Sequence, residues 1–293
     1  MRVFITGASG GIGSVVVPEL IAAGHEVLAL ARSDASAQAV TAAGATALRG
    51  DLTDPETLRA GAAETDGVIH LAFGNDFTDF GRCVAEEALA VETFGAALKG
   101  TGKPLVIASG TPAVPGRPST EADPAPTEGP AGGRGRNAQA VLDLAGQDVR
   151  SGVVRLPRSV HDQGGPYGFA SVLVGAARRT GVSGYVGDGT QRWPAVHRLD
   201  AARLFRLVLE EGTPGTVVHA VADEGDSMRA IAEVIGRQLG LPTEAVPTES
   251  FGFLGNVFAL DQRASSAITR EKFDWRPTHP SLLEDLEAGG YPG

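Results

Sequence analysis

Residues 3 to 17 read Val3-Phe4-Ile5-Thr6-Gly7-Ala8-Ser9-Gly10-Gly11-Ile12-Gly13-Ser14-Val15-Val16-Val17. The first three residues predict a short apolar strand, the glycines predict a turn, and the valines predict the start of a helix. Backbone N–H groups of such a turn and the N-terminus of the helix attract phosphate anions. This stretch therefore predicts a site for the pyrophosphate of a dinucleotide within an α/β fold.

The glycines of this turn are needed for different structural reasons. Gly7 lets the chain turn sharply, and Gly13 lets the helix pack closely on the strand. Glycines between them let backbone amides approach the phosphates. The predicted cofactor-binding residues of the turn are Gly7, Ser9, Gly10, Gly11, Ile12 and Gly13. A glycine-rich turn without a ligand is the alternative, and the strand before it and the helix after it favour the cofactor site.

Strand-like and helix-like segments alternate through the first half of the chain. The predicted strands are 3–5, 26–30, 45–48, 67–71, 104–108 and 152–156, and the predicted helices are 11–23, 35–43, 55–63, 77–99 and 137–145. This alternation predicts a Rossmann-type, doubly wound parallel sheet with helices on both faces. Asp34 and Asp54 are expected to be N-caps, and Pro55 follows the second of them.

After residue 156 the alternation loosens, with helices expected at 169–179, 199–210 and 227–239 and a strand at 216–221. We predict a cofactor-binding core at 1–160 plus 196–222, and a smaller C-terminal substrate-covering region at 161–195 plus 223–293. Residues 110–133 are rich in Pro, Gly, Thr and Glu and predict a long loop. We favour a flap over the substrate for this loop, with a disordered linker as the alternative.

Composition excludes several classes of protein. The chain has 293 residues, of which 42% are hydrophobic and 20% charged, as expected for a soluble globular protein. The single cysteine, Cys83, excludes an internal disulfide framework and a cysteine-rich metal site. A net charge of −10 disfavours nucleic acid and anionic membranes as partners. The chain opens into a strand and has no long apolar run, so we expect a cytoplasmic protein without a signal peptide.

The end of the second predicted strand distinguishes NAD from NADP. An acidic residue there would bind the ribose 2′-hydroxyl of NAD, whereas this chain has Leu30-Ala31-Arg32-Ser33. A guanidinium beside a hydroxyl suits a 2′-phosphate, so we predict NADP(H) with Arg32 and Ser33 as its ligands. Arg32 as a solvated surface arginine, and Asp34 reaching the ribose, remain the alternatives.

Other segments at predicted strand ends are expected to contact the cofactor. Asp51 after the third strand is expected to accept the adenine amino group, and Leu52 to pack on the ring. Small and apolar residues close the fourth strand and let the cofactor lie against the backbone; these are Leu71, Ala72 and Phe73.

Several motifs occur in a familiar order. They are Thr6–Gly13, Asp51-Leu52, Leu71-Ala72, Ser109, Val154-Arg155-Leu156-Pro157, Ser159-Val160-His161 and Val196-His197-Arg198-Leu199-Asp200-Ala201-Ala202. With these, the whole chain resembles the short-chain dehydrogenase/reductase superfamily, in its extended or atypical NAD-dependent epimerase/dehydratase branch. The resemblance implies that Pro157 lines the cofactor site and that Ser109 is part of the catalytic site.

The catalytic pair of that family is absent from this chain. The family places a tyrosine four residues before a lysine, because a cationic neighbour lowers the phenol pKa toward the operating pH. Of Tyr167, Tyr185 and Tyr291, the first two are followed four residues later by Ser171 and Gly189, and the chain ends before a third. The lysines are Lys99, Lys103 and Lys272, none of them in the expected helix.

The expected place of the pair holds Gly133-Arg134-Gly135-Arg136-Asn137. Arg136, with Asn137 beside it, could hold the nicotinamide ribose in place of the lysine. An arginine cannot donate a proton at neutral pH, because it stays protonated. The residues proposed to donate the proton instead are Ser109, Thr111, His161 and Tyr167.

Among these donors we favour His161, because an unperturbed histidine titrates near pH ~6.5. A packed loop histidine is the alternative, and His70 and His197 are interpreted as structural. Trp193 and Tyr185 either line a substrate pocket or belong to the core.

Three functions fit these observations. The first is an NADPH-dependent reductase that transfers hydride to a C=O or C=N group of a small organic substrate; C=N fits somewhat better, because an iminium needs no internal acid. The second is a sensor or scaffold that binds NADP(H) without chemistry. The third is a sugar-nucleotide epimerase or dehydratase. The helices at 77–99 and 137–145 either form a homodimer interface or only cover the sheet.

Overall fold

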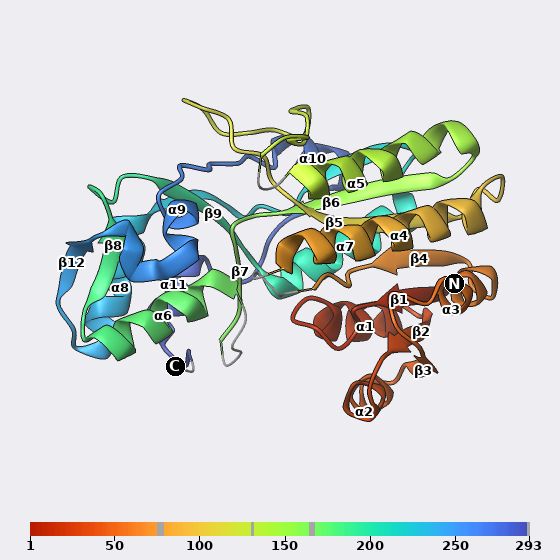
Figure 1. Ribbon diagram of the computed structural model, residues 1–293, viewed down its shortest axis with the longest axis horizontal. Coiled ribbons are helices and arrows are strands. Elements are labelled where there is room, and N and C mark those ends of the chain that lie inside the picture. Colours follow the sequence, from red (N-terminus) through yellow and green to blue (C-terminus); the bar gives the residue numbers. More distant parts are fainter. Residues whose placement is uncertain (75–78, 130–131, 164–167, 292–293) are drawn as a thin grey trace. The chain divides into compact units, whose positions relative to one another are not determined.

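The computed structural model describes residues 1–74, 79–129, 132–163 and 168–291 (Figure 1). The chain forms two compact units. The first comprises Met1–Ser109, Pro124–Arg155 and Ala202–Val218, and the second comprises Gly110–Asp123, Leu156–Ala201 and His219–Gly293. Among the described residues, no helix has both the length and the apolar character needed to cross a bilayer.

The first unit is built on a seven-stranded sheet in the order β10-β6-β5-β4-β1-β2-β3. The bounds of its strands are β1 Arg2–Thr6, β2 Glu26–Ala31, β3 Thr46–Arg49, β4 Gly67–His70, β5 Pro104–Gly110, β6 Arg150–Leu156 and β10 Thr216–His219. The β1–β2, β1–β4, β2–β3 and β4–β5 pairs are parallel. The direction of strand succession reverses between β1 and β4, which is where open α/β sheets bind ligands.

Helices cover this sheet on both faces, as predicted for a Rossmann-type fold. They are α1 Gly13–Ala22, α2 Asp34–Ala42, α3 Pro55–Ala63, α4 Phe80–Leu98, α5 Gly132–Asp143 with the short 3-10 helix η2 Leu144–Gln147, and α7 Arg198–Glu211. Helices α3, α4 and α5 share one core with the sheet, in which Phe4, Phe94 and Leu105 are fully buried. Helix α1 is tied to α7 by an ion pair of 2.7 Å between Glu19 and Arg206.

One of the two predicted N-caps is confirmed and the other is wrong. Asp54 accepts hydrogen bonds from the backbone N–H groups of the first turn of α3, with Pro55 at the first helical position. At α2 the cap is Ser33, whose hydroxyl accepts from the Ser36 N–H at 3.1 Å in a reciprocal capping box. The helix thus begins one residue earlier, and Asp34 lies in its first turn.

The second unit contains strands that the sequence pattern does not reveal. Strands β7 Ser159–His161, β9 Arg192–His197 and β11 Asp223–Ser227 form one sheet, and β8 Ser183–Val186 pairs with β12 Thr243–Val246. They are short, and β11 consists of polar residues and a glycine, so they lack the apolar alternation of a typical strand.

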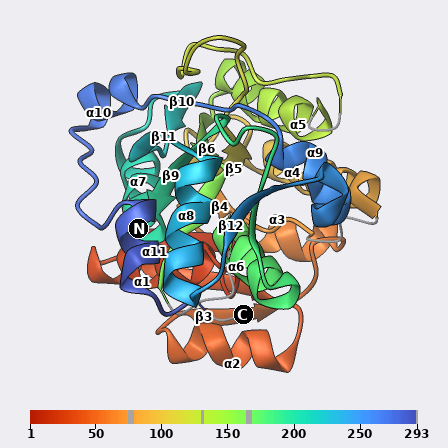
Figure 2. The ribbon, with the colours of Figure 1, turned by 90° about the vertical axis from the view of Figure 1, so that its left-hand side faces the viewer.

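Six further helical segments complete the second unit. They are α6 Gly168–Thr180, α8 Met228–Leu239, η3 Thr248–Leu254, α9 Gly255–Phe258, α10 Ala267–Phe273 and α11 Leu282–Ala288. Helix α8 lies between α6 and α11 in Figure 2. Their core surrounds the fully buried Trp193 and Phe258.

The loop after β5 is bonded at its centre to the segment before α10. Ser119 forms a parallel bridge with Ala264, and the buried Glu121 carboxylate accepts from the N–H and hydroxyl of Thr269 at 2.7 and 2.5 Å. These bonds contradict the linker alternative for this part of the loop. Helix α5 then begins at Gly132, earlier than predicted, so the end of the expected loop is helical.

Candidate functional site

The glycine turn packs directly against the end of β4. Gly7 has a φ of +71°, and a Cβ there would lie 2.6 Å from the Ala72 nitrogen. A Cβ on Gly13 would lie 2.2 Å from the Gly7 carbonyl oxygen, so only glycine lets α1 begin this close to β1. The turn is closed by a hydrogen bond of 3.0 Å from the Gly10 N–H to the Gly7 carbonyl. The predicted turn residues and Leu71-Ala72 therefore form one backbone cradle.

The N-terminus of α1 is open to an anion. Its N-cap, Ile12, has no side-chain capping hydrogen bond, and no acidic residue lies in the first turn. The partial positive charge of the helix end therefore has no compensating group from these side chains. Together with a backbone that leaves no room for a Cβ, this fits the diphosphate of a nicotinamide dinucleotide.

The tips of β2 and β3 bring two arginines to the predicted 2′-phosphate position. Arg32 follows β2, and Arg49 ends β3 opposite Ala31 in the parallel register. Arg49 also forms an exposed ion pair of 3.3 Å with Asp34. Arg49 is a further candidate ligand that was not predicted, and its position at the end of the strand next to β2 is the signal that could have identified it.

Asp51 is held locally in the turn after β3. Its Oδ1 accepts from the N–H and the hydroxyl of Thr53 at 3.0 and 2.8 Å. These two hydrogen bonds, with a smaller effect of the Arg32 charge, lower the pKa of Asp51. The carboxylate is therefore ionised at neutral pH, and Leu52 beside it is half-buried against the core of the first unit.

A buried hydrogen-bond chain orders the segment after β4. The Thr6 hydroxyl accepts from the Ala72 N–H at 3.3 Å and lies 2.6 Å from His70 Nδ1. Burial, assisted by the Arg134 charge, lowers the pKa of His70 to about 3, so the ring is neutral. A neutral His70 accepts at Nδ1 from the Thr6 hydroxyl and holds the strand end against the glycine turn.

Of the two arginines between residues 133 and 137, Arg134 lies at the strand ends. Its Nη2 is 2.8 Å from Glu87 Oε1 and 2.9 Å from the Ala108 carbonyl of β5, and its guanidinium lies 4.1 Å from the centroid of the Phe73 ring. Arg136 is bonded instead to the Thr127 carbonyl at 2.5 Å. The cation beside β4 and β5 is therefore Arg134.

Asn137 and Ser109 have different surroundings. The Asn137 amide donates to Glu87 Oε2 at 2.9 Å and to the Val84 carbonyl at 3.0 Å, so it joins α5 to α4. Ser109 is buried near the end of β5. Both belong to the first unit, whereas Thr111, Pro157 and His161 belong to the second. Tyr167 lies outside the described residues.

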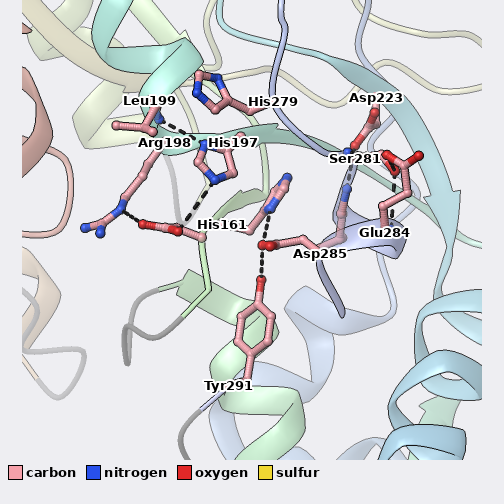
Figure 3. Close-up of polar contacts among 12 residues, drawn as sticks. His161, His197, Arg198, Leu199, Asp223, His279, Ser281, Glu284, Asp285 and Tyr291 are labelled. Carbon is pink, nitrogen blue, oxygen red and sulfur yellow. Dashed lines mark hydrogen bonds and ion pairs between the residues drawn. The ribbon is translucent and has the colours of Figure 1, made fainter. Parts of the chain in front are cut away.

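His161 in the second unit is linked to two other buried side chains, Asp285 and Tyr291, by a chain of hydrogen bonds (Figure 3). His161 Nδ1 lies 2.8 Å from Asp285 Oδ2, and the Tyr291 hydroxyl donates to the same oxygen at 2.7 Å. Burial raises the pKa of Asp285, but the hydrogen bonds from His161 and Tyr291 outweigh it and lower that pKa overall. An ionised Asp285 fixes the proton on His161 Nδ1. The other nitrogen, Nε2, is buried and has no hydrogen-bond partner within the described parts of the chain.

His197 and His279 stack beside this group, with ring centroids 4.7 Å apart. His197 Nδ1 accepts from the Leu199 N–H at 3.3 Å, which leaves its Nε2 facing Asp162 at 3.5 Å. His279 Nδ1 lies 2.9 Å from Asp200. Burial, with the neighbouring histidine charges, lowers the pKa of His197. These bonds are consistent with the structural role predicted for His197.

A pH test follows from Asp226 on β11. Burial, and then the neighbouring Asp223 carboxylate, raises the pKa of Asp226 from 3.8 to about 6. Because the folded pKa is the higher one, ionising Asp226 destabilises the fold above about pH 6, and this effect vanishes below about pH 4. We expect Asp226→Asn to raise the free energy of unfolding by about 1 kcal/mol at neutral pH, after allowance for solvent screening, with no gain at low pH.

Urea unfolding of the variant and the wild type, at neutral pH and at low pH, measures this change in the free energy of unfolding. The matched control is Asp188→Asn, at an exposed carboxyl whose pKa is lowered by hydrogen bonds from Thr190, so this change should give no gain at neutral pH. An equal gain for Asp226→Asn at both pH values would contradict the assignment.

Comparisons with known proteins agree with this architecture. A model of the NAD dependent epimerase/dehydratase family matches residues 3–221. An uncharacterized protein of Schizosaccharomyces pombe is 42% identical over 297 residues, covering 99% of this chain and 100% of that protein. A 2'-dehydrokanamycin reductase of Streptomyces kanamyceticus is 28% identical over 308 residues, covering 99% of this chain and 80% of that protein.

The fold is also that of solved structures. The crystal structure of a UDP-glucose 4-epimerase from Thermotoga maritima with UDP-glucose matches with a TM-score of 0.81 at 20% identity, covering 98% of this chain and 96% of that one. The match of the family model over most of the chain, with the glycine turn and strand order described above, confirms the predicted superfamily. The chain belongs to the NAD dependent epimerase/dehydratase family.

Proposed function

We propose that this protein is an NADPH-dependent reductase that transfers hydride to a C=O or C=N group of a small organic substrate. The observation that carries the proposal is the backbone cradle at Gly7, Gly13 and Ala72, next to an uncapped helix N-terminus. NADPH, when bound there, supplies the hydride. A reductase of Streptomyces kanamyceticus and a UDP-glucose 4-epimerase of Streptomyces lividans are similar to this chain to nearly the same degree, so the relatives do not separate reduction from epimerisation. The missing tyrosine and lysine pair is what favours reduction, because an epimerase needs the proton-transferring tyrosine.

The residues at the tips of β2 and β3 support NADP(H) over NAD(H). Arg32 and Arg49 offer two guanidinium groups, and the Asp34 carboxylate, shortly after the end of β2, is paired with Arg49. Ser33 is the N-cap of α2, so its hydroxyl lies at the positive end of that helix. A 2′-phosphate is a dianion that benefits from each of these groups.

Replacing Arg32 by glutamate tests this preference. We expect Arg32→Glu to weaken NADPH binding about 100-fold, because a charge-assisted contact is lost and a like charge replaces it, while NADH binding changes little. Isothermal titration with both cofactors measures the ratio. Arg59→Glu makes the same charge change on the exposed face of α3, where Arg59 pairs with Glu56, and should leave the ratio unchanged. Equal losses for NADPH and NADH would refute the assignment.

In this proposal His161 supplies the proton that a developing alkoxide needs. Asp285 accepts a hydrogen bond from the Nδ1–H and stabilises the imidazolium, and Tyr291 holds Asp285 in place. The unpartnered Nε2 is then the atom that gives up its proton. Arg134, with Phe73 and Ser109 at the ends of β4 and β5, is proposed to hold the nicotinamide ribose in place of the family lysine, in preference to Arg136.

Turnover decides between this proposal and its alternatives. The purified protein is mixed with NADPH and a panel of ketones, aldehydes and cyclic imines, and NADPH absorbance is followed. We expect oxidation with at least one class. Tight NADPH binding without any turnover would instead favour the sensor, and stoichiometric NAD retained through purification would favour the epimerase or dehydratase.

The remaining parts of the proposal concern organisation. We propose that the region 161–195 plus 223–293 covers the substrate, that α4 and α5 form a homodimer interface, and that the protein is cytoplasmic. The exposed Leu89 on α4 is consistent with such an interface.

A further inference from the structure

An arginine in the second unit has a charge that no acidic residue among the described ones neutralises. Arg158 lies between β6 and β7, and its Nη2 donates to the neutral amide oxygen of Gln262. Its Nε is buried and has no hydrogen-bond partner, and no carboxylate within the described ranges pairs with it. Burial lowers the pKa of Arg158 to about 10, so the group is still a cation at neutral pH. A desolvated cation without a counter-charge is unfavourable, which points to an anion from outside the chain.

Two more buried polar atoms near Arg158 also lack a partner. The Trp193 Nε1 and the Thr111 hydroxyl make no hydrogen bond within the described part of the chain. Gln262 links Arg158 to Thr111, because its amide nitrogen donates to the Thr111 carbonyl. The guanidinium and the indole N–H can only donate, so the group has donors and needs an acceptor. Native proteins rarely leave several buried polar atoms unsatisfied, so these donors and the hydroxyl are expected to bind a group from outside the chain, such as a ligand or water.

Two aromatic rings, of Phe169 and Trp193, lie beside the same guanidinium. Arg158 Cζ lies 5.8 Å from the ring centroids of both Phe169 and Trp193. The ring of Phe258 packs against both of them, with its centroid 5.7 Å from that of Phe169 and 5.0 Å from that of Trp193. Trp193 and Phe258 are fully buried in the core of the second unit, so the surroundings of the guanidinium on this side are apolar and offer few hydrogen-bonding groups to a sugar.

We infer that Arg158 binds the carboxylate of a small aromatic or otherwise apolar substrate, with the indole N–H of Trp193 as the second donor. The inference rests on the proposed function for the reaction that this molecule undergoes. A carboxylate accepts two hydrogen bonds in one plane, which suits the planar donors of a guanidinium.

The first experiment compares two ligands that differ only in charge. The wild-type protein, with and without NADP⁺, is titrated calorimetrically with 3-phenylpropionate and with its neutral amide. We expect the acid to bind at least about 10-fold more tightly, because a charge-assisted contact stabilises only the acid. The chain has two tryptophans, so quenching of the remaining fluorescence in Trp275→Phe places the ligand beside Trp193.

Two variants then assign the effect to the guanidinium. Arg158→Met keeps an unbranched apolar stem but removes the guanidinium, and it is expected to lower the affinity for the acid to that for the amide, while NADPH affinity stays unchanged. Arg158→Lys keeps the charge without the planar donors and should give an intermediate affinity. The control Arg237→Met removes an exposed arginine that pairs with Glu287, and it should change the affinity for neither the acid nor the amide.

Each of several outcomes would overturn the inference. Equal affinities for acid and amide in the wild type would do so, and so would absence of binding by both; these measurements do not depend on the folding of any variant. Tighter binding of UDP than of the acid, abolished by Arg158→Met, would assign the site to a diphosphate instead. Acid binding without turnover of any substrate would support this inference and count against the proposed reductase. Turnover of neutral carbonyls without acid binding would support the reductase and count against this inference.

Discussion

Gly7→Ala should abolish measurable NADPH binding and lower the free energy of unfolding by about 2–5 kcal/mol. An alanine must adopt the left-handed backbone of residue 7, where φ is +71°. Its Cβ would also lie 2.6 Å from the Ala72 nitrogen and 2.8 Å from the Leu71 carbonyl carbon, both of them backbone atoms that cannot move aside alone. The turn and the end of β4 would separate, and the phosphate cradle would be lost.

Gly24→Ala separates the two causes of this loss. Gly24 also has a left-handed backbone, with φ of +85°, but a Cβ there would meet no atom within 4 Å. This control should lower stability by only about 1–2 kcal/mol and leave cofactor affinity unchanged. Urea unfolding and titration with NADPH measure both quantities. If Gly7→Ala binds NADPH as well as Gly24→Ala does, the cradle is not the cofactor site.

His161→Asn should lower kcat for a carbonyl substrate by about 10²–10⁴-fold without changing NADPH affinity. The asparagine amide can still donate to Asp285, as His161 Nδ1 does over 2.8 Å, so the surroundings are retained. What is lost is the nitrogen that would give up a proton. For an iminium substrate, which needs no proton from the protein, the loss should be much smaller.

The control for this variant is His25→Asn. His25 pairs with Glu210 at 2.7 Å in the first unit, apart from both proposed binding regions, so kcat should stay at the wild-type value. Steady-state kinetics with one ketone and one cyclic imine, together with NADPH titration, give all the values needed. A kcat that falls equally for both substrates would indicate loss of structure and not loss of a proton donor.

The parts of the fold that could be predicted are those whose signal is local. The glycine turn, the Asp54-Pro55 helix start and the parallel strands of the first unit each depend on neighbouring residues or on buried apolar runs. The strands of the second unit were missed because they are short, and β11 is polar. The cap of α2 was placed one residue late because Ser33 and Asp34 are both good N-caps, and only the backbone angle of Ser33 selects it.

The sequence by itself determined the glycine turn, the alternation of strands and helices in the first unit, and the absence of the tyrosine and lysine pair. Only the tertiary structure decided which groups meet. It brought Asp285 to His161 across 124 residues of chain and placed Arg134 at the ends of β4 and β5. It also left Arg158 without an acidic partner in the part of the chain that the structure describes. The physical reason is that a turn or a helix start is stabilised by contacts between neighbours, whereas a buried hydrogen bond between distant segments depends on the whole path of the chain.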